Sequence, residues 1–219
     1  MWTLGTRKKR ILLKGANRVE KYILGLFAQF IIAVAILPYI VSIFRGTVKP
    51  NRISWFIWSL VGFTFWLVTP KDADSVTKML TLLFMLSPTT VFCITLFKGE
   101  NRLPDGLEIF SLLVGLLAIS LWVVARESAG ITPTIIAIVA DLCALLPTLR
   151  FVYASPEQER PFTWMAFSFG SLLGVLSIET HSLQNLLLPA YMAFGSSLVV
   201  YPLVRYRLKM KVAFREWIV

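Results

Sequence analysis

Asp141 is the residue best placed to do chemistry, because it is the only acidic residue in the middle of a long apolar block. Placing a carboxylate at the centre of a bilayer costs about 2.5–3.5 kcal/mol on insertion scales, so such a side chain normally faces a partner or water. It can couple a proton or another cation to transport, bind a polar solute, or simply tie two helices together. Arg150 is not expected to be its partner, because it lies on the opposite side of a helix, about 180° around the axis.

Two prolines, Pro38 and Pro147, form a second set of candidates, because each interrupts an apolar block near its middle. A proline removes one backbone N–H and frees the carbonyl one turn earlier. In a transporter such breaks act as hinges and expose polar backbone atoms to a cavity, although membrane helices also tolerate prolines without any such role. The residues that follow them, Tyr39 and Thr148, are candidates for the same solute pathway.

Tryptophans supply candidates for a solute pocket, because flat aromatic faces hold apolar surfaces. Trp58, one turn inside its block, is the best of them. Trp55 and Trp164 stand near block starts, where the headgroup region of the membrane is the favoured location, and Trp66 and Trp122 are also expected at the membrane interface.

Weaker signals come from other polar breaks and from small residues. Pro88, among hydroxyl side chains, and Asn185, near the start of the last block, are further pathway candidates. Ala166, Gly170 and Gly174 recur every four residues, a pattern that allows close helix packing in membranes.

The elements that must position these residues are apolar blocks. Of the 219 residues, 57% are hydrophobic and 16% charged, with a mean hydropathy of +0.72, whereas soluble domains have about 45–50% and 25%. Spanning a bilayer takes about 20 apolar residues, and lipid-exposed backbone must satisfy its own hydrogen bonds, which predicts helices. The blocks, seven in number, are 22–44, 53–70, 76–97, 107–125, 132–152, 162–180 and 185–204.

An internal repeat organises the blocks. A shift of 109 residues places Ala35 to Pro38 on Ala144 to Pro147, and Ser54-Trp55 on Thr163-Trp164. Because an even number of crossings separates the two prolines, the repeats are parallel, a recurring plan in secondary transporters. We therefore predict an all-α membrane protein in a 3+1+3 arrangement: three-helix bundles at 22–97 and 132–204, a linker helix at 107–125, and basic tails at 1–21 and 205–219.

These stretches resemble the PQ-loop and SWEET-type superfamily, whose members have Leu-Pro-Gln in the first and fifth helices and Ser-Trp at the start of the next helix. The matching segments here are Leu37-Pro38-Tyr39 with Ser54-Trp55, and Leu146-Pro147-Thr148 with Thr163-Trp164. Both glutamines are replaced, so this chain would be an outlying member. It is similar also to seven-helix bacterial membrane proteins with the Lys-Pro-x-Arg-x-Ser-Trp segment seen from Lys49 to Trp55. The resemblance implies a carrier fold for small solutes.

Charge and composition indicate which classes of binding partner and activity to expect. The net charge of +10 lies in tails and loops, so anionic lipid headgroups are expected partners and nucleic acid is not. The single histidine, His181, falls in a loop, and the sequence has neither a phosphate-binding loop nor a metal-ligand cluster. We therefore expect no enzyme activity, no cofactor and no metal. The seventh block lacks the lysine that a retinal protein would need.

The prediction that follows is a carrier of an unidentified small solute, working by alternating access between the two repeats. The alternative is a membrane subunit or receptor that uses the same fold to bind a partner; a homo-oligomer also remains open. A cavity that reaches Asp141 would favour transport, and a dry centre would favour the subunit. Basic residues in the loops favour a cytoplasmic C-terminus, whereas the basic segment before the first block favours the opposite orientation. A cytoplasmic C-terminus is also the usual orientation of the family that the chain resembles, so we expect it here, in the bacterial inner membrane that the resemblance implies.

Overall fold

The computed structural model describes residues 3–68, 75–99, 103–125, 131–178 and 183–218. Within these ranges the chain forms α-helices, two short 3-10 helices and no β-strand, so the all-α prediction is confirmed. The helices are α1 (Thr3–Phe44), α2 (Arg52–Val68), α3 (Ser75–Lys98), α4 (Gly106–Ala125), α5 (Thr132–Ala154), η1 (Pro156–Gln158), α6 (Pro161–Ser177), α7 (Leu183–Lys209) and η2 (Phe214–Trp217).

Five helical segments in the described residues are long and apolar enough to cross a membrane, which supports an integral membrane protein. They lie in α1, α3, α4, α5 and α7. The other two predicted spans, α2 and α6, are apolar but have 17 residues each, or about 25 Å of helix, which is less than the roughly 30 Å hydrocarbon core.

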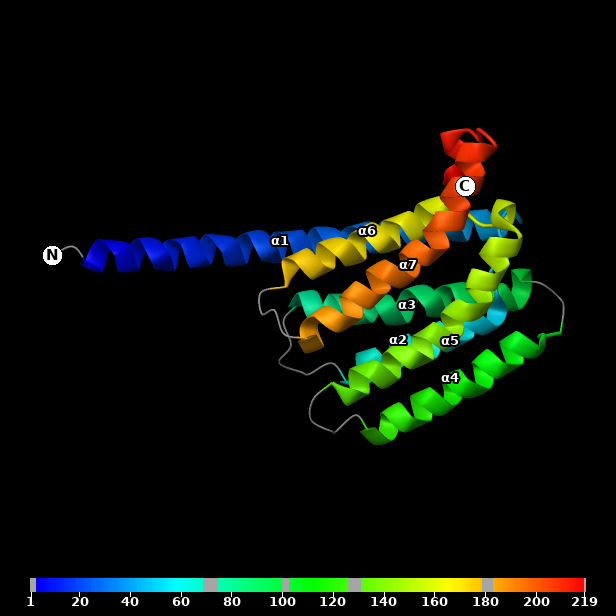
Figure 1. Ribbon diagram of the computed structural model, residues 1–219, viewed down its shortest axis with the longest axis horizontal. Coiled ribbons are helices and arrows are strands. Elements are labelled where there is room, and N and C mark those ends of the chain that lie inside the picture. Colours follow the sequence, from blue (N-terminus) through cyan, green and yellow to red (C-terminus); the bar gives the residue numbers. More distant parts are fainter. Residues whose placement is uncertain (1–2, 69–74, 100–102, 126–130, 179–182, 219) are drawn as a thin grey trace.

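Two helices extend beyond the predicted blocks. α1 has 42 residues and begins at Thr3, so the predicted basic tail at 1–21 is largely helical. Figure 1 shows this part of α1 projecting well past the other helices. α7 likewise runs to Lys209, so the first residues of the predicted tail at 205–219 continue the helix.

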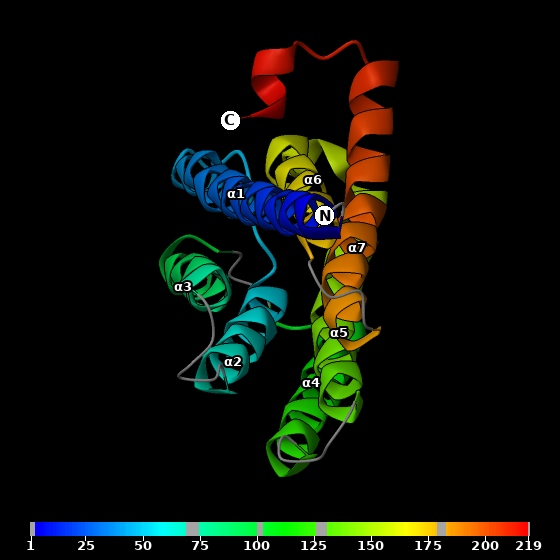
Figure 2. The same cartoon turned by 90° about the vertical axis from the view of Figure 1, so that its left-hand side faces the viewer.

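The helices alternate in direction, so α1, α3, α5 and α7 end at one side of the molecule, which we call the C-terminal face (Figure 1). In the first half, α1–α3, helix α3 packs against both α1 and α2; in the second half, α5–α7, helix α7 packs against both α5 and α6. Between the halves, α1 contacts α6 and α2 contacts α5, while α4 lies on the outside against α5 and α2 (Figure 2).

Trp58 is at the centre of the packing, because it contacts all three clusters of buried apolar residues. Close helix contacts surround this centre. A Cβ atom at Gly62 of α2 would lie 2.1 Å from the carbonyl oxygen of Phe84 in α3, and one at Gly170 of α6 would lie 2.6 Å from Ile32 in α1. Both positions therefore require glycine for the observed approach.

Local sequence signals fix the helix ends at the C-terminal face. α1 stops before Gly46, whose φ of 72° allows a turn that few other residues adopt. Asn51 caps α2 by accepting a 3.0 Å hydrogen bond from the Ser54 amide. At the start of α4, Asp105 and Glu108 each accept a hydrogen bond from the other's backbone amide, at 3.1 and 2.9 Å, which is a capping box.

Candidate functional site

A cavity of about 80 Å³ lies between the two halves, with room for on the order of five water molecules. Its lining comes from α1, α2, α3, α5, α6 and α7 and consists mainly of aromatic and aliphatic side chains. Three of the predicted pathway residues, Trp58, Pro88 and Asp141, line it. A mostly apolar cavity with a few polar groups is the usual form of a small-molecule site.

Ten of the 17 described lining residues form five pairs with the same spacing of 109 residues that the sequence shows. Each half contributes one member of each pair. The pairs are Ile32 and Asp141, Trp55 and Trp164, Trp58 and Phe167, Leu83 and Met192, and Ser87 and Ser196.

Asp141 is held in this cavity by a neutral hydrogen-bond donor. The hydroxyl of Tyr191 in α7 donates to Asp141 Oδ2 at 2.9 Å. Asp141 is the acidic member of the lining, and none of the described lining residues is basic. An ionised Asp141 would therefore have a donor beside it but no countercharge among the described lining residues.

Aromatic rings form a continuous chain from the first half to the second. Ring centroids are 5.4 Å apart between Tyr39 and Trp55, 5.1 Å between Trp55 and Trp58, and 5.8 Å between Trp58 and Trp164. Phe167 extends the chain, with its ring 6.3 Å from that of Trp164. The rings thus connect the two halves across the cavity.

Three tryptophans do not occupy the interface positions that the sequence favoured. Trp55 and Trp164 are 4% and 6% exposed and line the cavity. Trp122 is also buried, whereas Trp66 remains exposed. Trp55 packs in a buried cluster with Tyr39, Ile43 and Val48, and Trp164 packs in another with Val152 and Leu203, so contacts between helices bury both indoles inside the protein.

Hydrogen bonds join the halves between the cavity and the C-terminal face, and they involve corresponding residues. Thr148 of α5 donates to Ser54 of α2 at 3.0 Å between oxygens. Thr163 of α6, which corresponds to Ser54, donates to the Ala35 carbonyl of α1 at 3.0 Å. The Ser/Thr-Trp pairs therefore place a hydroxyl between the halves and an indole in the cavity wall.

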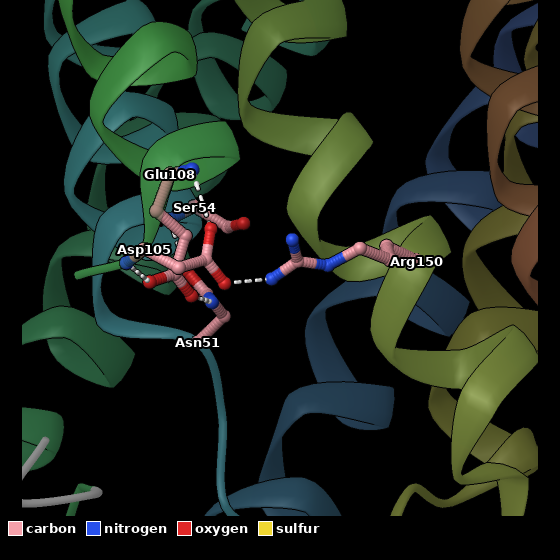
Figure 3. Close-up of polar contacts among 5 residues, drawn as sticks. All are labelled: Asn51, Ser54, Asp105, Glu108 and Arg150. Atoms are coloured by element: carbon pink, nitrogen blue, oxygen red, sulfur yellow. Dashed lines mark hydrogen bonds and ion pairs between the residues drawn. The ribbon is translucent and has the colours of Figure 1, made fainter.

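A polar cluster at this face anchors the start of α4 (Figure 3). Asn51 donates to Glu108, which is buried, and Arg150 forms an ion pair with Asp105. The hydrogen bond from Arg150 is the main reason that the pKa of Asp105 is lowered. Arg150 therefore pairs with the start of α4, which agrees with its expected separation from Asp141.

Glu159, in the segment between α5 and α6, is a second buried acid at the C-terminal face, besides Glu108. It is 2% exposed and accepts a 3.0 Å hydrogen bond from the Tyr39 hydroxyl. Burial raises its pKa to about 7, against the opposing effects of the Arg160 amide, Tyr39 and the charges of Arg160 and Arg207. The side chain of Tyr39 therefore extends from α1 to this segment and does not line the cavity.

Stability should fall as pH rises through the titration of Glu159. A carboxyl group whose pKa is raised from 4.5 to about 7 favours the folded state below pH 4.5 and loses that contribution through about pH 7. Glu159→Gln mimics the protonated form, so we expect its thermal midpoint to change less than that of the wild type between about pH 5 and pH 8. Glu157→Gln, at an exposed neighbour, is the control and should keep the wild-type slope. A Glu159→Gln profile parallel to that of the wild type would contradict this assignment.

The remaining predicted residues are not among the described residues that line the cavity. Pro147 and Thr148 are buried in α5, and Pro38 lies in α1, which continues as a helix through the proline. Asn185 lies in the first turn of α7. Of the small-residue series, Gly170 is pressed against Ile32, Ala166 is half-buried, and a Cβ at Gly174 would meet no atom within 4 Å.

Several site residues were missed by sequence reasoning. Ser196 and Phe167 were detectable, because each lies 109 positions after a polar or aromatic candidate. Tyr191 had no such signal, because Leu82 occupies the corresponding position. Among the described residues no group of three His, Cys, Asp or Glu side chains could hold a metal ion, and His181 lies outside the described residues.

No family model matches this chain, and no curated protein or solved structure matches it either.

Proposed function

We propose that this protein is a membrane carrier that moves a small solute by alternating access between two parallel repeats. The cavity shared by the two halves, with Asp141 in its wall, is the observation that carries the proposal. An intramembrane acid that faces a cavity is typical of substrate and ion pathways. Sites of secondary transporters also lie at the interface between repeats.

The proposed architecture is the 3+1+3 arrangement, with three-helix bundles at 22–97 and 132–204 and a linker helix at 107–125. The bounds of α2 and α6 support it, because their first and last residues are both separated by 109 positions. The contacts support it too, since the order α1–α3–α2 recurs as α5–α7–α6 and each first helix contacts the second helix of the other half. Membership of the PQ-loop and SWEET-type superfamily remains part of the same proposal.

Alternating access requires the contacts at the C-terminal face to break and re-form. Two hydrogen bonds join opposite halves, one from Tyr39 to Glu159 and one from Thr148 to Ser54. Tyr39 directly follows Pro38, and Thr148 directly follows Pro147. A bend at either proline would move these hydrogen bonds, because the donor shares a helical turn with the proline. The prolines are therefore the proposed hinges, and these hydrogen bonds are the proposed gate.

The alternative, a membrane subunit that transports nothing, is less well supported because the centre of the molecule contains a cavity at Asp141.

We place the protein in a bacterial inner membrane with a cytoplasmic C-terminus and with anionic headgroups at its basic ends. A reporter fused to the C-terminus tests this orientation.

A thermal-stability screen of the purified protein against metabolites, followed by uptake into proteoliposomes, tests transport. We expect saturable uptake of a metabolite that stabilises the protein. The absence of uptake for every such metabolite would favour the membrane subunit.

The double substitution Pro38→Ala and Pro147→Ala should slow uptake at least about tenfold, which corresponds to about 1.4 kcal/mol in the barrier. Alanine restores the missing backbone hydrogen bonds and stiffens both helices, so folding should be preserved. Pro202→Ala, within α7 but without a repeat partner, is the control. Wild-type uptake by the double variant, with normal expression, would remove the hinge role.

A further inference from the structure

We propose that the cavity binds a monovalent organic cation, namely a small ammonium compound with an apolar body. This inference deepens the proposed carrier function and rests on it, because the ammonium compound would be the transported solute. Three properties of the cavity support it: an acid without a countercharge, a wall of aromatic rings, and an unequal distribution of charge between the two halves.

The first property is the charge on Asp141. Its hydrogen-bond partner, Tyr191, is neutral and donates its hydroxyl to the carboxyl group. A donated hydroxyl suits an ionised carboxylate, which only accepts, but it leaves the negative charge in place. No described lining residue is basic, so a cationic occupant would supply the countercharge that an ionised Asp141 lacks.

The second property is the aromatic wall. Trp55, Trp58, Trp164 and Phe167 all line the cavity, and their rings are linked from one half to the other. The face of an aromatic ring attracts cations, most strongly for tryptophan, and aromatic cages are a general means of recognising quaternary ammonium groups. A carboxylate next to such rings favours an alkylammonium group over a neutral polar group.

The third property is asymmetry. The residue that corresponds to Asp141 in the first half is Ile32, so α5 contributes a carboxyl group to the lining where α1 contributes an aliphatic side chain. A ligand with one charged end and one apolar end matches this difference. A zwitterion does not match it, because its own carboxylate would find no cation among the described lining residues.

Other occupants fit less well. A neutral polyol needs many hydrogen-bond partners, but the lining offers few polar side chains besides Asp141, Tyr191, Ser87 and Ser196. A bare metal cation prefers several oxygen ligands, and the described residues contain no group of three His, Cys, Asp or Glu side chains that could hold one.

Calorimetric titration of the full-length purified protein tests the inference with matched probes. The probes are choline and 3,3-dimethylbutan-1-ol, which has the same shape with carbon in place of the charged nitrogen. We expect choline to bind at least about tenfold more tightly than the alcohol. Asp141→Asn should reduce the affinity for choline to that of the alcohol, whereas Glu157→Gln, which removes an exposed acid outside the cavity, should leave it unchanged.

Equal affinities for the two probes, no binding of choline in the millimolar range, or unchanged choline binding in Asp141→Asn would each overturn the inference. Displacement of choline by sodium at equal concentration would also overturn it, because the site would then hold an inorganic cation.

Uptake into proteoliposomes separates this inference from the carrier function on which it builds. Binding of choline without uptake of any solute would leave the ammonium site standing and would remove the proposed transport. Uptake of a neutral solute by a protein that does not bind choline would leave the carrier standing and would remove the ammonium site.

Discussion

Joining α2 to α5 through Ser54→Cys and Thr148→Cys is expected to abolish transport under oxidising conditions, and a reductant should restore it. The two hydroxyl oxygens are 3.0 Å apart in adjacent helices of opposite halves, and a disulfide requires Cβ atoms about 3.5–4.5 Å apart. The cross-link would hold the C-terminal face closed. Cys93→Ser and Cys143→Ala in the same chain remove the two native thiols, and uptake into proteoliposomes is the measurement.

We call this cross-link the lock, and its matched control is a disulfide within one half. Ser168 of α6 and Ser197 of α7 have their hydroxyl oxygens 2.7 Å apart, so the pair Ser168→Cys and Ser197→Cys forms a similar disulfide. If each half moves as a unit, this second cross-link should leave uptake nearly unchanged. Equal loss of uptake in both cross-linked proteins, or unchanged uptake in the first, would contradict movement between the halves.

Replacement of Arg207 by alanine is expected to destabilise the protein by about 3–5 kcal/mol, because hydrogen bonds to a charged group contribute about 1.5–3 kcal/mol each. Arg207 is 2% exposed and donates to the carbonyls of Pro156, at 2.6 Å, and Glu159. These contacts fasten the segment between α5 and α6 to the end of α7. Denaturation of the purified protein in detergent, followed by tryptophan fluorescence, measures the loss.

Two further variants separate the hydrogen bonds of Arg207 from its charge. Arg207→Lys keeps the charge but loses the planar fork, so an intermediate loss of stability is expected. Arg205→Ala removes an exposed arginine from the same helix and should change stability by no more than about 0.5 kcal/mol. An Arg207→Ala protein as stable as Arg205→Ala would show that these carbonyls do not depend on the guanidinium.

The sequence was most informative where an uncommon residue type lies within an apolar block or recurs after 109 positions. Asp141 and Trp58 were predicted as pathway residues and both line the cavity. The recurrence of Ser/Thr-Trp after 109 positions predicted corresponding residues, and the structure places both indoles in one cavity wall. Hydropathy likewise predicted the helices, because continuous apolar blocks satisfy the membrane only as helices.

The sequence was least informative where burial depends on contacts between distant segments. Arg207 was counted with the basic tail, because nothing in the local pattern shows that backbone carbonyls of η1 surround it. Trp55 and Trp164 were placed at the membrane interface on residue type alone. The first block was predicted to start at residue 22, where the sequence becomes apolar. A charged segment can continue a helix beyond the membrane, however, and α1 begins at Thr3.

Accessibility of Ser87→Cys to a membrane-impermeant thiol reagent tests the central claim without knowledge of the solute. Ser87 lines the cavity from α3, and the native cysteines are replaced as above. Alternating access predicts that the thiol is modified from either side of the membrane, and that the oxidised Ser54→Cys and Thr148→Cys lock stops modification from the C-terminal face alone. Modification from one side only in the protein without the lock, or modification of the locked protein from the C-terminal face, would contradict a carrier.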